Sequence, residues 1–137
     1  MTMKNLVLAA LVAATAAGAA EAEGAKVGMI TTLSGGGAGL GIDVRDGFML
    51  AIEQSGRDDI EVIIEDDQQK PDIAVQIADK MLQSDKVDVM TGIIWSNLAM
   101  AVVPSVTAQG VFYLSPNAGP SQLAGAGCHE NYFNVAW

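Results

Sequence analysis

The stretch Thr31-Thr-Leu-Ser-Gly-Gly-Gly-Ala-Gly-Leu-Gly41 follows an apolar run and precedes a helical pattern. Its glycines at 35, 36, 37, 39 and 41 carry no side chains that would keep a ligand away from the backbone N–H groups. We expect a helix to begin near Asp43, and a helix N-terminus favours an anionic group. The stretch therefore predicts a loop between a strand and a helix whose backbone approaches a ligand.

Strand and helix patterns alternate on both sides of this loop. Apolar runs predict strands at residues 26–31, 60–65, 87–94 and 111–115. Helical spacing predicts helices from Asp43 to Gly56, from Pro71, and from Ser96 to Gly110, with a kink at Pro104. In the first helix the inward face is expected to carry Val44, Gly47, Phe48, Ala51 and Ile52. This alternation predicts an α/β fold with an open parallel sheet and helices on both faces. If the strand order is 2-1-3-4, the first and third strands flank the crevice where a ligand would bind.

Residues 1–22 have the pattern of a secretory signal peptide. Lys4 precedes an apolar run from Leu6 to Ala17, and the segment ends in Ala20-Glu21-Ala22, an A-x-A cleavage site. We therefore expect a periplasmic location, with residues 23–137 forming the mature part of one α/β domain. The closing run Tyr132–Trp137 resembles a strand, so we expect the domain to be incomplete and a second lobe to be absent from this sequence.

The charge balance argues against nucleic acid as a partner. The chain carries 7 basic and 16 acidic residues, a net charge of −9, whereas phosphate backbones are bound by clustered Lys and Arg. The acidic runs are Glu65-Asp66-Asp67 and Arg57-Asp58-Asp59. We favour a solvated surface for both runs over a metal site, because their spacing matches no metal-binding loop.

Cys128 is the only cysteine, and its partner would have to lie outside this sequence. A buried or unpaired thiol is the simpler interpretation. A nucleophile is the least favoured, because the only histidine, His129, is its neighbour in sequence.

Ligands of open parallel sheets bind beyond the carboxyl ends of the strands, where the strand order reverses. This rule selects three loops, at residues 33–41, 95–97 and 115–120. They supply N–H groups, hydroxyls and amides but no cation and no carboxylate pair, which favours a site that holds an anion without catalysis. The candidate residues are Leu40, Gly41, Trp95, Ser96, Asn97, Asn117, Ala118 and Gly119.

Each candidate also has a structural interpretation. Ser96 either donates to a carboxylate at a helix N-terminus or only caps its own helix. Trp95 either stacks on a ligand or fills the core. Asn117 and Gly119 either contact a ligand or satisfy a turn, and Ser34 has the same ambiguity.

Nucleotide-binding motifs are not found. Counting G-x-G-x-x-G from the glycines at 35, 37 and 39 places Leu40, Ile42 and Val44 at the last glycine, and no Gly-Lys-Ser/Thr follows the loop. We therefore expect no cofactor and no metal, and an exported α/β enzyme would need catalytic residues beyond Trp137.

Four segments in this order resemble the type I periplasmic binding proteins of ABC transporters, of the Leu/Ile/Val-binding kind. They are Lys26–Gly35, Asp46–Ala51, Val87–Gly92 and Leu114–Asn117. The resemblance implies a receptor, monomeric when complete, that holds a small solute between two lobes and delivers it to ABC permease subunits. A sensor domain of the same fold is the alternative.

The resemblance also implies roles for individual residues. The ligand carboxylate would be held by Ser96, Asn117 and Gly119, and Leu40 stands where an aromatic residue often contacts the ligand. Gly119 replaces a hydroxyl residue common in amino-acid binders, and Trp95 stands where some relatives carry a disulfide cysteine. These departures make aromatic carboxylates and amides as plausible as branched-chain amino acids.

Overall fold

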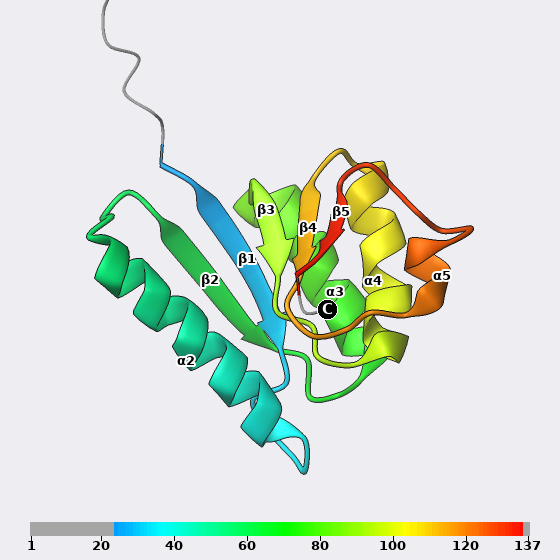
Figure 1. Ribbon diagram of the computed structural model, residues 1–137, viewed down its shortest axis with the longest axis horizontal. Coiled ribbons are helices and arrows are strands. Elements are labelled where there is room, and N and C mark those ends of the chain that lie inside the picture. Colours follow the sequence, from blue (N-terminus) through cyan, green and yellow to red (C-terminus); the bar gives the residue numbers. More distant parts are fainter. Residues whose placement is uncertain (1–23, 136–137) are drawn as a thin grey trace, which may run out of the picture.

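Five parallel strands form one sheet in the order β2-β1-β3-β4-β5 (Figure 1). The computed structural model describes residues 24–135, so the signal peptide expected at residues 1–22 lies outside the described residues. The strands are β1 (Lys26–Thr31), β2 (Glu61–Asp66), β3 (Val89–Thr91), β4 (Phe112–Ser115) and β5 (Tyr132–Asn134). The expected order 2-1-3-4 is confirmed, and β5 extends the sheet beyond β4.

The helices divide between the two faces of the sheet. Helix α2 (Ala38–Ser55) lies on one face beside β1 and β2, whereas α3 (Pro71–Lys80) and α4 (Ser96–Ala108) lie on the other (Figure 1). The chain moves to one side from β1 to β2 and to the opposite side from β2 to β3, so right-handed crossovers place these helices on opposite faces. A π-helical turn, η1 (Met81–Asp85), extends α3, and α5 (Ser121–Ala124) is a single turn.

The main core lies between the sheet and the α3–α4 pair. Ile30, Met90 and Tyr113 project into it from three neighbouring strands and are fully buried. Leu98, Val102 and Val106 of α4, together with Ala74 and Ala78 of α3, cover them. Small residues on α3 allow that helix to approach the strands closely.

Helix α2 begins at Ala38, five residues before the expected Asp43. Its first turn packs so tightly on the end of β1 that a Cβ at Gly41 would lie 1.9 Å from the Thr32 carbonyl oxygen. That packing explains why a glycine-rich segment, which has low helix propensity, is helical here. The expected end of the helix is confirmed, because Gly56 follows it in the left-handed conformation with φ 67°.

The inward face of α2 is narrower than expected. Phe48 and Ile52 are half-buried and line one hollow with Val27 of β1. Gly47 and Ala51, expected on the same face, are exposed. A single helix against a flat sheet buries only the residues along its line of contact, so the flanks of the apolar stripe remain outside.

Strand β3 is shorter than the expected run 87–94. Gly92 adopts φ 107° and approaches β1 so closely that a Cβ would lie 2.6 Å from the Ile30 carbonyl oxygen. The chain therefore leaves the sheet after Thr91, although Ile93 and Ile94 remain buried. Helix α4 runs through Pro104, where the sequence predicted a kink, without a break in the helix.

Half of the α2 face is uncovered by helices in the described part of the chain. Phe112 and Leu114 of β4 and Phe133 of β5 project from this half and are 48%, 37% and 47% exposed. The rings of Phe112 and Phe133 stack with centroids 6.2 Å apart. Within residues 24–135 no helix is both long enough and apolar enough to cross a bilayer.

Candidate functional site

The three loops selected from the sequence meet at the carboxyl end of the sheet. The Asn117 side-chain amide donates to the Ile94 carbonyl oxygen at 2.9 Å, which joins the loop after β4 to the loop after β3. Gly37 lies against the indole of Trp95, since a Cβ there would lie 2.5 Å from the Trp95 ring. The loop after β1 therefore touches the segment that carries Ser96.

Ser96 is the first residue of α4. The N-cap residue is Trp95, and no side chain caps the helix, so the interpretation of Ser96 as the cap of its own helix is wrong. Ser96 and Asn97 are exposed, and the Ser96 hydroxyl makes no hydrogen bond within the described residues. The first N–H groups of a helix have no intrahelical acceptor, so a hydroxyl and N–H donors are both available at this end of α4.

Trp95 is connected to two buried side chains behind the site. Its indole Nε1–H donates to Thr32 Oγ1 at 2.9 Å, and the Thr32 hydroxyl donates to Asp67 Oδ1 at 2.6 Å. The backbone N–H of Gln69 donates to the same carboxylate oxygen at 2.8 Å. We call Trp95, Thr32 and Asp67 the indole relay. It links the ends of β3, β1 and β2.

The neighbouring carboxylates of Asp66 and Asp67 have opposite pKa shifts. Burial dominates at Asp67 and raises its pKa, although hydrogen bonds from Thr32 and Gln69 oppose the shift. Burial also acts to raise the pKa of Asp66, but hydrogen bonds from Ser34, Leu33 and Gln68 together hold it below its ordinary value. Ser34, a weak candidate from the sequence, therefore supports Asp66.

The expected solvated surface is only partly correct for the two acidic runs. Arg57, Asp58 and Asp59 are exposed, whereas Asp67 is fully buried because it closes the indole relay. Among residues 24–135 no group of three His, Cys, Asp or Glu side chains is placed to hold a metal ion.

Glycines of the loop after β1 serve different purposes. Gly35, Gly36 and Gly39 have open space where a Cβ would stand, whereas Gly37 and Gly41 are needed for close packing on Trp95 and Thr32. Leu40, on the first turn of α2, is 51% exposed and offers an apolar surface. Gly41 is buried, so its side of the helix faces the protein.

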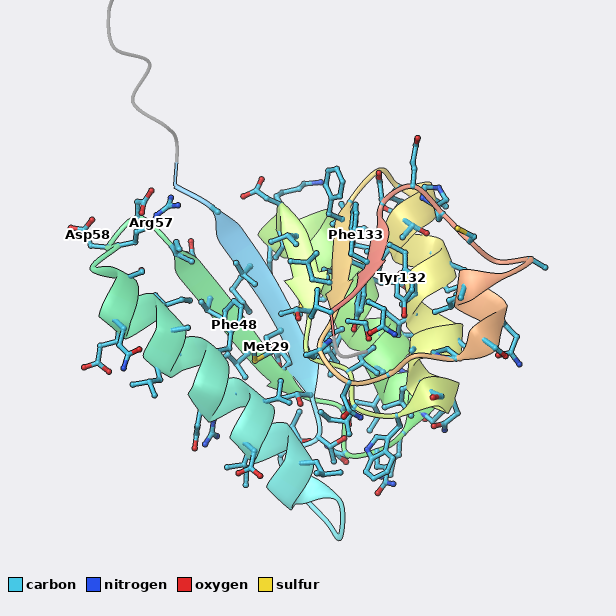
Figure 2. The ribbon with its side chains drawn as sticks, in the orientation of Figure 1. Met29, Phe48, Arg57, Asp58, Tyr132 and Phe133 are labelled. Carbon is cyan, nitrogen blue, oxygen red and sulfur yellow. The ribbon has the colours of Figure 1, made fainter. Side chains whose placement is uncertain are left out.

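The loop after β4 is fixed from within. The Ala118 carbonyl oxygen accepts hydrogen bonds from the hydroxyls of Ser115 and Tyr132, and Ala118 itself is buried, so it offers no side-chain surface. The ring of Tyr132, labelled in Figure 2, stacks on Tyr113 with centroids 6.2 Å apart. Gly119 lines a mostly apolar hollow of about 380 Å³, which neither Trp95 nor Ser96 lines; its walls are Gly119, Pro120, Ser121, Ala124, Tyr132 and Asn134.

Cys128 is an exposed free thiol in the described structure. His129 Nδ1 accepts the backbone N–H of Asn131 at 3.2 Å, so that nitrogen is engaged in a turn. This arrangement is that of an unpaired surface cysteine.

Sequence reasoning missed Thr32 and Asp67. Both lie directly after a strand, Thr32 after β1 and Asp67 after β2, which is the position where site residues of parallel sheets are expected. The signal was present, but Asp67 was included in the acidic run Glu65-Asp66-Asp67, for which we expected a solvated surface, whereas Glu65 and Asp66 are half-buried and Asp67 is buried.

The sequence profile of the family described as periplasmic binding protein matches residues 24–137. Among solved structures, an ABC transporter substrate-binding protein from Sphaerobacter thermophilus is 28% identical, with a TM-score of 0.77 over 80% of this chain and 31% of that chain. A solute-binding protein of an ABC transporter from R. palustris, in complex with benzoate, is 32% identical, with a TM-score of 0.77 over 81% of this chain and 32% of the other.

A third similar structure is the branched-chain amino acid transporter substrate-binding protein LivJ from Streptococcus pneumoniae, in complex with isoleucine. It is 26% identical, with a TM-score of 0.72 over 81% of this chain and 33% of the other. The chain thus spans about a third of the length of these structures. All three are substrate-binding proteins of transporters rather than enzymes, as the sequence predicted. No curated protein matches the chain.

Proposed function

This chain belongs to the periplasmic binding protein family, and on that premise we propose that it forms the ligand-binding N-terminal lobe of a solute receptor for an ABC importer. The proposed receptor is exported to the periplasm by the segment at residues 1–22. It closes a second lobe over the solute and presents the solute to permease subunits in the inner membrane.

The proposed ligand is a small carboxylate with an apolar or aromatic body. The observation that carries this proposal is the position of Ser96, whose unpaired hydroxyl stands at the N-terminus of α4 where the three loops meet. A helix N-terminus attracts a carboxylate, Trp95 directly precedes Ser96, and Leu40 supplies exposed apolar surface on the first turn of α2. Benzoate and isoleucine, the ligands in two similar structures, share this combination of a carboxylate and an apolar group.

The remaining candidate residues have supporting roles in this proposal. Asn97 lies on the exposed first turn of α4, beside Ser96. Asn117 and Gly119 carry the loop after β4 to the same edge, and the Asn117 side chain fixes that loop to Ile94. Gly41 and Ala118 are buried and shape the backbone rather than offering side chains to a solute.

Substitution of Ser96 tests the proposal in the complete gene product. Wild type, Ser96→Ala and the control Ser105→Ala are titrated by calorimetry with benzoate and with isoleucine. Ser105 is suitable as the control because its hydroxyl bonds the Val102 carbonyl oxygen farther along the same helix. Loss of a hydrogen bond to a charged group is expected to weaken binding by about 1.5–3 kcal/mol in Ser96→Ala alone. Equal affinities for the three proteins would contradict the role of Ser96.

A further inference from the structure

The indole of Trp95 is held by more than packing. One part of the ring lies against Gly37, where a Cβ would come within 2.5 Å, and the Nε1–H donates to Thr32 at 2.9 Å. Trp95 is also the N-cap residue of α4 and the direct neighbour of Ser96. A side chain fixed on both its ring and its N–H has little rotameric freedom, and its backbone sets the start of the helix.

The relay behind Trp95 is buried and directional. Thr32 and Asp67 are fully buried, and Thr32 accepts from the indole while it donates to Asp67 Oδ1. A hydroxyl has one proton, so its donation to Asp67 leaves its lone pairs to accept the indole N–H. The carboxylate therefore orients the hydroxyl, and the hydroxyl orients the indole.

The cost of the relay indicates that it has a purpose beyond stability. Asp67 is buried with its second oxygen, Oδ2, lacking a hydrogen-bond partner, and burial of an incompletely paired carboxylate is unfavourable. An apolar residue would avoid this penalty but would leave the Thr32 hydroxyl and the Gln69 N–H without their common acceptor. The carboxylate therefore fixes the geometry of the groups that donate to it.

We propose that Thr32 and Asp67 are positioning residues that hold the Trp95 indole as a fixed, specificity-determining wall of the ligand site beside Ser96. The proposal rests on the proposed function. The fixed indole stands next to the groups that donate to the ligand carboxylate, so it limits the width of the apolar group attached to that carboxylate. It favours a flat apolar group that packs on the ring.

Adjacent threonines provide a matched pair of variants. Thr32→Val removes the hydroxyl at constant shape and leaves the Trp95 indole N–H without its acceptor. Thr31→Val removes the neighbouring hydroxyl, which is buried and has no hydrogen-bond partner. Thr32→Ser restores the hydroxyl and serves as the conservative rescue.

The hydrogen bond is tested by NMR on the complete gene product, in which Trp95→Phe identifies the Trp95 indole N–H resonance by its loss. In wild type, Thr31→Val and Thr32→Ser we expect a downfield resonance whose hydrogen exchange is slowed at least about tenfold relative to Thr32→Val. The same resonance and exchange rate in Thr32→Val and wild type would overturn the proposal.

The functional part is tested by titration of the complete gene product with benzoate and with isoleucine. We expect Thr32→Val to lose about tenfold in affinity for benzoate, with near-wild-type affinity in Thr31→Val and Thr32→Ser. Loss of the indole hydrogen bond without loss of affinity would overturn the positioning role. If wild type binds neither benzoate nor isoleucine, the proposed function fails, and this inference fails with it. The indole N–H resonance still shows, independently of any ligand, whether the hydrogen bond to Thr32 exists.

Discussion

The two faces of the sheet differ in how completely they are covered. On the α3–α4 face, side chains such as Ile30, Met90 and Tyr113 are fully buried under two helices. On the α2 face only β1 and β2 are covered (Figure 1), and Phe112 and Phe133 are about half exposed. Parallel strands are normally apolar on both faces because helices cover both. The apolar strand sequences therefore favour burial on both faces of the sheet. In the described chain only the α3–α4 face is fully buried.

The largest expected change in the free energy of unfolding comes from a substitution on the face covered by α3 and α4. Leu98→Ala removes a fully buried side chain between α4 and the sheet, and we expect it to lower the free energy of unfolding by about 2–5 kcal/mol. Leu114→Ala on the uncovered face is the control, with an expected loss below about 1 kcal/mol because Leu114 is already 37% exposed. Urea unfolding followed by circular dichroism measures both. Similar losses would show that the two faces are equally packed in solution.

Substitutions in the first turn of α2 test how closely this helix packs on the end of β1. Gly41→Ala places a Cβ 1.9 Å from the Thr32 carbonyl oxygen, and we expect destabilisation by about 1–3 kcal/mol. Gly39→Ala, two residues earlier in open space, should stabilise the helix by up to about 1 kcal/mol. Thermal unfolding of the two variants should therefore shift in opposite directions. A stable Gly41→Ala variant would mean that the helix sits farther from β1.

The opposite pKa shifts of Asp66 and Asp67 predict that their contributions to folding stability change in opposite directions with pH. The pKa of Asp67 is raised above its ordinary 3.8, so the folded chain binds that proton more tightly than the unfolded chain. As the pH falls through the raised pKa, wild type should gain stability relative to Asp67→Asn, with the gain complete below the unfolded pKa. The pKa of Asp66 is lowered, so its stabilisation is present above 3.8 and is lost as the pH falls through the lowered value.

Urea midpoints of wild type, Asp67→Asn and Asp66→Asn, measured from neutral pH to about pH 3, check both directions. Parallel curves for wild type and Asp67→Asn would indicate that Asp67 is solvated rather than buried.

The smallest change in the free energy of unfolding is expected on the uncovered part of the α2 face. Phe133→Ala removes one ring of the stacked pair with Phe112, but the lost ring is already 47% exposed. We expect a loss of about 0.5–1.5 kcal/mol and weaker fluorescence of a dye that binds apolar surface. Unchanged dye fluorescence would indicate that the dye does not bind at this aromatic pair.

Several elements could be predicted from local sequence alone. The apolar run 26–31 was expected to be a strand and is β1, and Pro71 and Gly56 were correctly expected at the start of one helix and the end of another. These elements depend on hydrophobic period and on proline and glycine geometry, which act within a few residues. The parallel sheet with helices on both faces followed from the alternation of strands and helices and from the right-handed crossovers, which do not depend on detailed contacts.

The remaining features depend on contacts between distant segments. Helix α2 begins at Ala38 because Gly41 meets Thr32, and β3 ends at Thr91 because Gly92 meets Ile30. Asp67 is buried because it closes the relay that passes through Thr32 to Trp95. Sequence by itself determined the α/β class and the loops at the carboxyl edge, because hydrophobic periodicity and the chirality of the crossovers are local. Only the tertiary structure decided which glycines, acids and aromatics in those loops face each other, since close approach is a property of segments brought together by folding.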